Sequence, residues 1–466
     1  MIALQASVIA RAVEGALVGD DVLVSGSVQT DSRLVEPGDV FVAMPGEVTD
    51  GHRFVGTAVA AGAALVVCEH PIDEAVPHVV VDSGLAALQA LAAHVVAAVR
   101  EHCTVVGITG SNGKTTTKNM LQAILERHGE TVSPVKSFNN EVGAPMTMLR
   151  ATSSTRFLVL ELGASREGDI ASLVRLAMPD VSVVLKVGLA HAGEFGGVER
   201  TQRAKHEIVR DLPETAVAVL NRDDDRVAWM ADRTAARVRW FGLDAGADVA
   251  PDTVWASDVA SSIDGTSATI HRGDATWPMT LRILGEHHVM NALAALSVAD
   301  ELGVAIPDAI AALESMVRAE RWRMELLRPE TGVVVINDSY NASPDSMAAA
   351  LRTLAHVSRT SGARSVAVIG AMTELGESQV EEHDRVGRLV VRLGIDRLVV
   401  VGEGAKPVHD AAEHESSFGQ ETTYVETQEQ ALALLRATLE PGDVVLVKSS
   451  LSAGLKDLGD AIGGVA

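Results

Sequence analysis

The sequence predicts an α/β protein of three domains, and three observations support this. Apolar runs rich in Val, Ile and Leu alternate with helix-like segments along most of the 466 residues, a pattern typical of buried parallel sheets. The chain is too long for one ordinary core, so several domains are expected. The segment GITGSNGKTTT, residues 107–117, lies between a β-branched run and an amphipathic helix, which is the arrangement of a phosphate-binding loop.

We predict a small N-terminal α/β domain over residues 1–101. It opens with a short amphipathic segment, and a Pro-Gly pair at 45–46 ends its first clear strand, because proline and glycine break regular structure. Its expected elements are the amphipathic segment 2–17, strand 39–44, helix 52–62, strand 64–68 and helix 84–100.

The central domain, residues 102–320, is predicted to hold a P-loop-type, mostly parallel sheet. Its strands are continuous apolar runs, and a segment of alternating residues with Asp-Gly and Gly-Asp turns adds a small antiparallel part. The expected elements are strands 104–106, 157–160, 181–187 and 215–220, the antiparallel part 248–284 and helix 288–302.

The C-terminal domain, residues 321–466, also alternates apolar strands with helices and is predicted to be Rossmann-like. No glycine fingerprint opens a helix after its first strand, so the pattern does not indicate a dinucleotide site. The expected strands are 333–336, 365–369, 397–401 and 444–447.

Composition excludes several classes of protein. The net charge of -23 argues against a general binder of nucleic acid or of membrane surfaces. Only Cys68 and Cys103 are present, so a disulfide framework is not expected and a reducing compartment fits. The start lacks signal-peptide features, and the longest apolar stretch, 85–99, is too short to span a bilayer. We expect a cytoplasmic protein and take a monomer as the default.

The segment 107–117 predicts that the protein handles ATP. Gly110 and Gly113 let the backbone curl so that N–H groups point inward, and the following helix N-terminus adds partial positive charge. Lys114 can reach the β- and γ-phosphates, and the Thr115 hydroxyl can bind Mg²⁺. The spacing is shorter than in the common P-loop, whose first glycine would fall at Ile108. The remaining loop residues expected at the nucleotide are Ser111, Asn112 and Thr116.

Polar residues that follow apolar strands are further candidates, each with an alternative. Glu161 suits Mg²⁺, or it is an acid meeting water. His191 is a metal or phosphate ligand, or a structural hydrogen-bonder. Lys205 is, by spacing alone, an ordinary surface lysine. Asp338 begins a loop beside a possible ligand cleft, and Arg321 could stabilise a γ-phosphate or form a surface salt bridge.

Taken together, these motifs resemble one family, the Mur ligases, which are ATP-dependent amide-forming enzymes of peptidoglycan synthesis. The resemblance covers all three predicted domains, and the order and spacing of the motifs make it specific. The motifs are TGSNGKTTT (109–117), ELGAS with Glu161, the His191 segment, Lys205, GEHHVMNALAAL with Asn291, and Arg321.

The resemblance implies roles for these residues. Thr115 and Glu161 would bind one Mg²⁺, and His191 with a carbamylated Lys205, formed from CO₂, would bind a second. Lys114 and the loop would hold the ATP phosphates. The resemblance further implies that Asn291 meets the adenine, Arg321 the γ-phosphate, Asp338 the ribose or a metal-linked water, and Asp31, Ser32, Arg33, Asn139 and Asn140 the UDP-linked substrate.

Within the family, three segments are most similar to the member that joins D-alanyl-D-alanine to UDP-N-acetylmuramoyl-tripeptide. They are residues 30–52, 137–149 and DSYNASPDSM at 338–347, where Tyr340 and Asn341 would meet the dipeptide. The third residue of the tripeptide, lysine or a diaminopimelate, stays open. Related ligases often carry a late Lys-Gly-Ser-Arg run; residues 448–451 read KSSL, so no role is transferred to Leu451.

Two alternatives remain open from the sequence. The first is another Mur ligase or a folylpolyglutamate-synthase-like ligase, although the N-terminal block speaks against the folate enzyme. The second belongs to another class: a switch or binding module that hydrolyses ATP without forming a bond. The combination of Glu161, His191 and Lys205 has no evident use in such a module.

Overall fold

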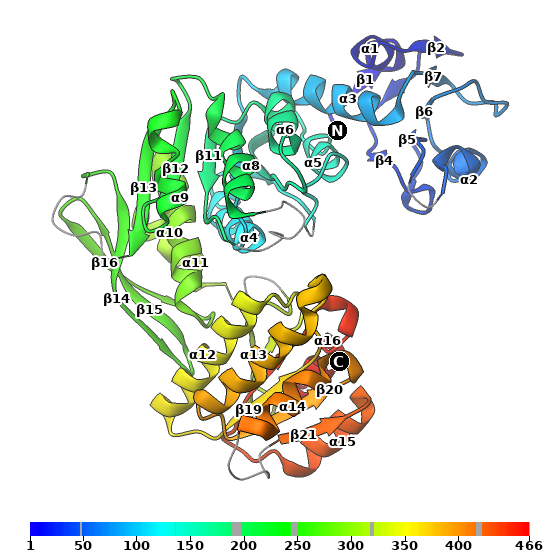
Figure 1. Ribbon diagram of the computed structural model, residues 1–466. Coiled ribbons are helices and arrows are strands. Elements are labelled where there is room, and N and C mark those ends of the chain that lie inside the picture. Colours follow the sequence, from blue (N-terminus) through cyan, green and yellow to red (C-terminus); the bar gives the residue numbers. More distant parts are fainter. Residues whose placement is uncertain are drawn as a thin grey trace. The chain divides into compact units, whose positions relative to one another are not determined.

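A computed structural model of the protein describes residues 1–46, 49–135, 137–188, 197–243, 250–316, 321–415 and 422–465. Its elements alternate between strands and helices along the chain (Figure 1), which confirms the predicted α/β class. The chain divides into two compact units. The first unit contains residues 1–241 and 297–304, and the second contains 242–296 and 305–466. The boundaries of the three domains stay a prediction.

The first unit opens with a small sheet of order β2-β7-β6-β5-β4, in which all pairs except β2–β7 are parallel. A separate antiparallel pair joins β1 and β3. The elements are β1 (Leu4–Gln5), α1 (Ala6–Ala12), β2 (Ala16–Val18), β3 (Leu23–Val24), β4 (Val28–Gln29), β5 (Val40–Val42), α2 (Val55–Ala60), β6 (Leu65–Cys68), β7 (His78–Val80) and α3 (Gly84–Val99).

The next part of the first unit is built on six parallel strands in the order β13-β12-β11-β8-β10-β9. Because the strands are parallel, their carboxyl ends share one edge, where ligands bind in such sheets. The elements are β8 (Thr104–Thr109), α4 (Lys114–Leu125), β9 (Glu130–Val132), α5 (Gly143–Met148), β10 (Thr155–Glu161), α6 (Asp169–Ala177), β11 (Val181–Val184), α8 (Val198–Arg210), β12 (Val217–Asn221), α9 (Asp225–Ala228) and β13 (Arg237–Leu243).

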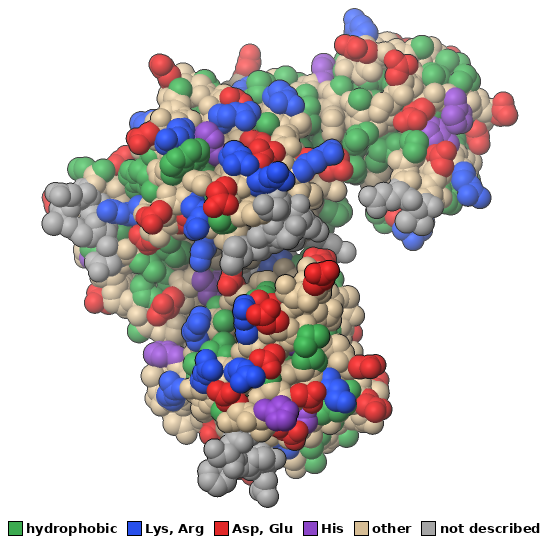
Figure 2. Space-filling view, viewed as in Figure 1, with side chains coloured by type: hydrophobic (Ala, Val, Ile, Leu, Met, Phe, Trp, Pro, Cys, Tyr) green, Lys and Arg blue, Asp and Glu red, His purple; other side chains and the backbone are tan. Residues whose placement is uncertain are grey.

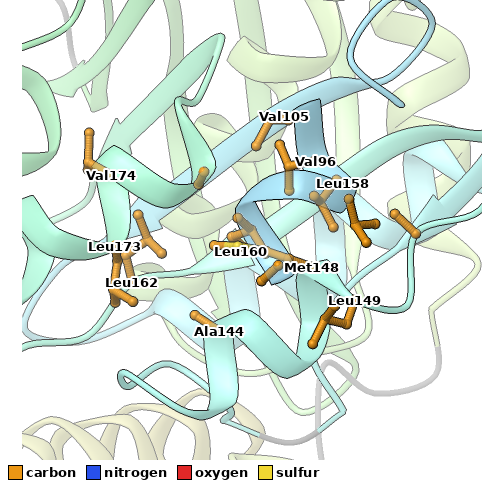
Figure 3. Close-up of a cluster of buried hydrophobic side chains, with 14 of the residues drawn as sticks. Val96, Val105, Ala144, Met148, Leu149, Leu158, Leu160, Leu162, Leu173 and Val174 are labelled. Carbon is orange, nitrogen blue, oxygen red and sulfur yellow. The ribbon is translucent and has the colours of Figure 1, made fainter. Parts of the chain in front are cut away.

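One face of this sheet is covered by helices through a continuous apolar core. Figure 3 shows Leu158 and Leu160 of β10 among side chains from α3, α5 and α6, including Met148 and Leu173. These side chains are buried, and alternate strand residues point to the same face. The core thus holds the sheet edge, and the loops that follow its strands, in a fixed frame.

The second unit contains the antiparallel strands β14 (Val254–Ser262), β15 (Gly265–Arg272) and β16 (Ala275–Leu281). The prediction of an antiparallel part in 248–284 is therefore confirmed for its described residues. Helix α10 (Glu286–Glu301) follows and crosses into the first unit's segment 297–304.

The rest of the second unit is a three-layer arrangement, as a Rossmann-like domain requires. The sheet order is β17-β18-β22-β19-β20-β21, parallel except for β17–β18. Alternate residues of each strand enter two separate cores, with α12, α13 and α14 on one face and α15 and α16 on the other (Figure 1). The elements are α11 (Ile306–Glu314), β17 (Glu325–Leu327), β18 (Val334–Asp338), α12 (Pro344–Ser361), β19 (Ser365–Ile369), α13 (Gln379–Arg392), β20 (Arg397–Val401), α14 (Lys406–Glu415), β21 (Thr422–Val425), α15 (Gln428–Thr438), β22 (Val444–Lys448) and α16 (Lys456–Ile462).

The structure differs from the predicted elements mainly in the opening segment. Residues 2–17 contain two short strands around α1 rather than one amphipathic stretch. This segment packs against α3, so tertiary contacts override its local pattern.

On the face shown in Figure 2, basic side chains are interspersed with acidic ones and form no continuous basic stripe. None of the helices in the described ranges is long and apolar enough to cross a bilayer. Cys68 and Cys103 are both buried, and burial raises the pKa of each thiol to about 11. Neither thiol is therefore ionised near neutral pH.

Candidate active site

The loop that we predict to bind phosphate joins β8 to α4. Gly113 precedes the helix with φ +87° and Gly110 has φ +156°, conformations that residues with a Cβ rarely adopt. A Cβ on Gly110 would lie 3.0 Å from Leu185 Cβ on the neighbouring strand's extension. Both glycines are therefore required by the path of the loop.

The loop carries its own internal contacts. Lys114 Nζ donates to Gly110 O at 2.7 Å, so the lysine side chain folds over the loop. Ser111 Oγ accepts from Gly188 N at 2.9 Å, which ties the loop to the segment after β11. Thr116 is buried and Asn112 is exposed. The arrangement places one ammonium group against the loop that precedes a helix N-terminus, a position that suits an anionic phosphate.

Thr115, in the first turn of α4, lies beside Glu161, the last residue of β10. Thr115 Oγ1 donates to Glu161 Oε2 at 3.0 Å, and Asn139 Nδ2 donates to Glu161 Oε1 at 2.9 Å. Glu161 is 1% exposed. Two hard oxygen donors next to a phosphate loop fit Mg²⁺, which prefers carboxylate, hydroxyl and phosphate oxygens.

Lys205 lies on α8 and is buried, unlike the surface lysine that spacing alone suggests; its exposed fraction is 5%. Burial, reinforced by the positive charge of Lys114, lowers the pKa of Lys205 to about 7. The negative charges of Glu207, Asp169 and Glu161 oppose this shift. A sizeable share of neutral amine is therefore present at neutral pH, which is the form that reacts with CO₂.

Glu207, two residues after Lys205 on α8, binds the start of α6. Its Oε1 accepts from Gly168 N at 2.6 Å and its Oε2 from Ala171 N at 2.9 Å. These N–H groups have no partner within the helix. The contact fixes α6 against α8 and with it the backbone around Lys205.

His191 lies outside the described residues. Within the ranges that the structure describes, no three His, Cys, Asp or Glu side chains gather as a metal cluster would require. The candidate magnesium position rests instead on a threonine hydroxyl and one carboxylate.

The residues expected at the UDP-linked substrate have local partners. Arg33 Nη2 pairs with Asp31 Oδ2 at 2.6 Å, and hydrogen bonds from Arg33 lower the pKa of Asp31 to about 2. Ser32 is buried beside them. Asn140 Oδ1 accepts from Gly143 N at 2.8 Å and so helps to start α5.

In the second unit, Asp338 ends β18 and carries two contacts. Asp338 Oδ1 accepts from Met324 N at 3.1 Å, and Asp338 Oδ2 accepts from Lys448 Nζ at 2.6 Å. The turn after β18 brings Tyr340 and Asn341 next to this pair. The Tyr340 ring lies under the Arg323 guanidinium, whose Cζ is 4.3 Å from the ring centroid.

Arg321 is paired with a carboxylate of the last helix. Its Nη2 lies 2.7 Å from Asp460 Oδ2, and its Cζ lies 5.0 Å from the Trp322 ring centroid. Asn291 is buried on α10. Three residues earlier, His288 is fully buried, and desolvation moves its pKa well below the usual value.

Two features of the site have no counterpart in the sequence analysis. Asn139 orients Glu161, and Lys448 holds Asp338. The sequence does contain a signal for Lys448, because it is a lysine at the end of the apolar run VVLVK. Polar residues at strand ends lie at the ligand edge of a parallel sheet.

Comparison with known proteins agrees with this geometry. Family models described as Mur ligase family catalytic domain, Mur ligase middle domain and Mur ligase glutamate ligase domain match residues 26–105, 108–299 and 322–451. A relative from Mycobacterium tuberculosis named UDP-N-acetylmuramoyl-tripeptide–D-alanyl-D-alanine ligase is 44% identical, over 94% of this chain and 92% of the relative.

Two crystal structures extend the likeness to the fold. MurF from Acinetobacter baumannii superposes with a TM-score of 0.88 at 31% identity, covering 99% of each chain. MurF ligase from Thermotoga maritima in complex with ADP gives a TM-score of 0.81 at 30% identity, over 94% of this chain and 97% of that one. The phosphate loop, the strand-end carboxylate and near-complete coverage by these relatives together establish that the chain belongs to the Mur ligase family.

Proposed function

We propose that the protein is the ATP-dependent ligase that adds D-alanyl-D-alanine to UDP-N-acetylmuramoyl-tripeptide, releasing ADP and phosphate. The 44% identity over 94% of the chain to a relative named for this reaction carries the proposal. The contact between Thr115 and Glu161 beside the predicted phosphate loop also supports the proposal, because two oxygen donors there suit the Mg²⁺ that accompanies ATP. We place the reaction in the cytoplasm, on a monomeric enzyme.

The reaction has to activate a carboxylate. Transfer of the ATP γ-phosphoryl group to the tripeptide's terminal carboxylate gives an acyl phosphate, and the free amine of the dipeptide then attacks the acyl carbon. The tetrahedral intermediate collapses with loss of phosphate and forms the amide. Because the first step joins two anions, Lys114 and Arg321 offset the repulsion.

Two magnesium ions fit this scheme. Thr115 and Glu161 would hold one, and His191 with a carbamylated Lys205 would hold the other. Bound Mg²⁺ supplies charge neutralisation at the phosphates. Carbamylation joins the neutral Lys205 amine to CO₂ and releases a proton, which turns a poor ligand for Mg²⁺ into an oxygen ligand. The pKa of about 7 supports this step.

The remaining assignments follow the family resemblance. Lys114 and the loop residues Gly110, Ser111, Asn112, Gly113 and Thr116 would hold the phosphates. Asn291, Arg321 and Asp338 would also contact ATP. The UDP-linked substrate would be bound by Asp31, Ser32, Arg33, Asn139 and Asn140, and the dipeptide by Tyr340 and Asn341.

The test is a coupled phosphate-release assay with UDP-N-acetylmuramoyl-tripeptide, ATP and Mg²⁺, with and without D-alanyl-D-alanine, followed by mass spectrometry. We expect phosphate release that depends on the dipeptide and a product whose mass increases by that of the dipeptide less water. Parallel reactions with meso-diaminopimelate, lysine and glutamate distinguish the other ligases. A rate of phosphate release that is the same with and without each acceptor would instead identify an ATP-hydrolysing module.

A further inference from the structure

Lys448 is a buried lysine to which the proposed function assigns no role. It ends β22, the strand between β18 and β19, and its side chain is 1% exposed. Removing an ammonium group from water is costly unless it is paired and hydrogen-bonded. Its partners therefore indicate what it does.

Both partners of Lys448 belong to the same short segment. Lys448 Nζ donates to Asp338 Oδ2 at 2.6 Å and to Asn341 O at 2.9 Å. Asp338 and Lys448 are register partners on the parallel strands β18 and β22. One ammonium group thus spans the end of β18 and the turn that follows it.

The turn between β18 and α12 is fixed at several points. Tyr340 N donates to Trp322 O at 3.1 Å, and Ser343 caps α12 through a capping box with Ser346. Between these points, the Asn341 carbonyl is held by Lys448. Lys448 therefore holds the backbone of this turn at Asn341, the residue between Tyr340 and the start of α12.

We infer that Lys448 is a positioning residue that sets Asp338 and the Tyr340–Asn341 turn in one geometry. The inference rests on the proposed function, in which Asp338 serves the nucleotide and the turn serves the dipeptide. Lys448 acts through these groups and touches neither substrate. Its loss should therefore change the apparent affinity for the dipeptide and not only the amount of folded enzyme.

The chain provides a matched control at the opposite end of β22, where the strand lies beside β19. Arg364, just before β19, pairs with Asp443, just before β22, with Arg364 Nη2 2.6 Å from Asp443 Oδ2. Asp443 is buried. Arg364→Met therefore also deprives a carboxylate of its cation, but at the amino ends of the strands, away from the ligand edge.

The experiment measures steady-state KM and kcat of the full-length enzyme for ATP and for D-alanyl-D-alanine. The variants are Lys448→Met, Asp338→Asn, the double variant and Arg364→Met, each with its thermal unfolding midpoint. The double variant leaves no unpaired buried charge, so it serves if Lys448→Met does not fold. Asp338→Asn removes the ion pair but keeps the lysine contact to Asn341 O. It therefore separates the effect of Lys448 on Asp338 from its effect on the Tyr340–Asn341 turn.

We expect the dipeptide KM to rise about tenfold in Lys448→Met and in the double variant, and to stay within about twofold of wild type in Asp338→Asn and Arg364→Met. The effects of Lys448→Met and Asp338→Asn on kcat should be less than additive, since both act on one pair. A double variant with the dipeptide KM of Asp338→Asn, or an equal rise in Arg364→Met, overturns the inference. Wild-type enzyme that forms no amide product refutes the proposed function itself.

Discussion

Thr115 Oγ1 and Glu161 Oε2 are joined by a hydrogen bond of 3.0 Å, although the two residues are 46 positions apart in the chain. The parallel pairing of β8 with β10 places Glu161, which ends β10, near the first turn of α4, which follows β8. Two of the oxygens that one magnesium ion would need are thus adjacent.

Replacing Thr115 with valine should weaken the metal site without changing its shape. We expect Thr115→Val to raise the Mg²⁺ concentration needed for half-maximal ligation by about tenfold or more. The substitution removes a hydroxyl that both donates a hydrogen bond to Glu161 and would itself bind the metal. Titrating ligase activity with MgCl₂ at saturating ATP measures this. Thr117→Val on the same helix is the control, because Thr117 Oγ1 is buried without a hydrogen-bond partner among the described residues; an equal shift there would argue against a special role for Thr115.

Lys114 should matter for turnover more than for folding. Lys114→Met removes the ammonium group that lies over the loop, and we expect kcat to fall by about 100-fold or more because a charge at the transferring phosphoryl group is lost. Phosphate release and far-ultraviolet circular dichroism, measured on the same sample, separate the two effects. Full activity with intact structure would contradict the assignment of the loop.

Carbamylation of Lys205 should increase with pH around neutrality. The folded-state pKa of about 7 lies below the ordinary 10.5, so the amine is mainly protonated below pH 7 and mainly neutral above it. Only the neutral amine adds CO₂, and a proton is released, so both factors favour the carbamate as pH rises. Carbon-13 NMR with labelled CO₂ at fixed dissolved concentration should show a carbamate signal that grows between pH 6 and about 8 and is absent in Lys205→Ala.

The same alanine variant predicts a chemical rescue. Lys205→Ala should lose most of its activity, and short carboxylic acids such as acetate should restore part of it, because they can supply the missing oxygen ligand. The ligase assay with increasing acetate tests this, with wild type as the reference for ionic-strength effects. Equal stimulation of both proteins by acetate would count against a carbamylated lysine.

Glu207 should contribute to stability through the start of α6. Glu207→Ala leaves the N–H groups of Gly168 and of the buried Ala171 without their acceptor, and we expect the free energy of unfolding to fall by about 2 kcal/mol. Urea unfolding followed by circular dichroism measures the change. Glu199→Ala, at an exposed position of the same helix, should cost less than about 0.5 kcal/mol.

The predictable parts of the fold are those with a strong local signal. The apolar runs that form β10, β19, β20 and β22 lie within two residues of their predicted bounds, in keeping with how strand boundaries vary. Strands of two or three residues such as β3 and β9 carry too little periodicity to be seen. The edge strand β21 is half-buried along its length, so it lacks the continuous apolar run of a central strand.

The site divides in the same way. Loop residues such as Gly113 and Lys114 follow from spacing, because the chemistry of the loop is local. The burial of Lys205 arises from packing of α8, and the pair of Lys448 with Asp338 joins residues 110 positions apart. The run VVLVK shows that Lys448 ends a strand, but the identity of its partner and the burial of Lys205 both depend on distant residues, so neither could be predicted from a short window.

The two buried cysteines have a practical consequence. With each thiol shielded and its pKa near 11, maleimide reagents at neutral pH should react slowly with the native chain, since the attacking species is the thiolate. A single cysteine introduced on the surface can then carry a fluorophore or a spin label while Cys68 and Cys103 stay in place. Spectroscopic study of substrate-dependent motion can therefore begin from the otherwise unaltered enzyme.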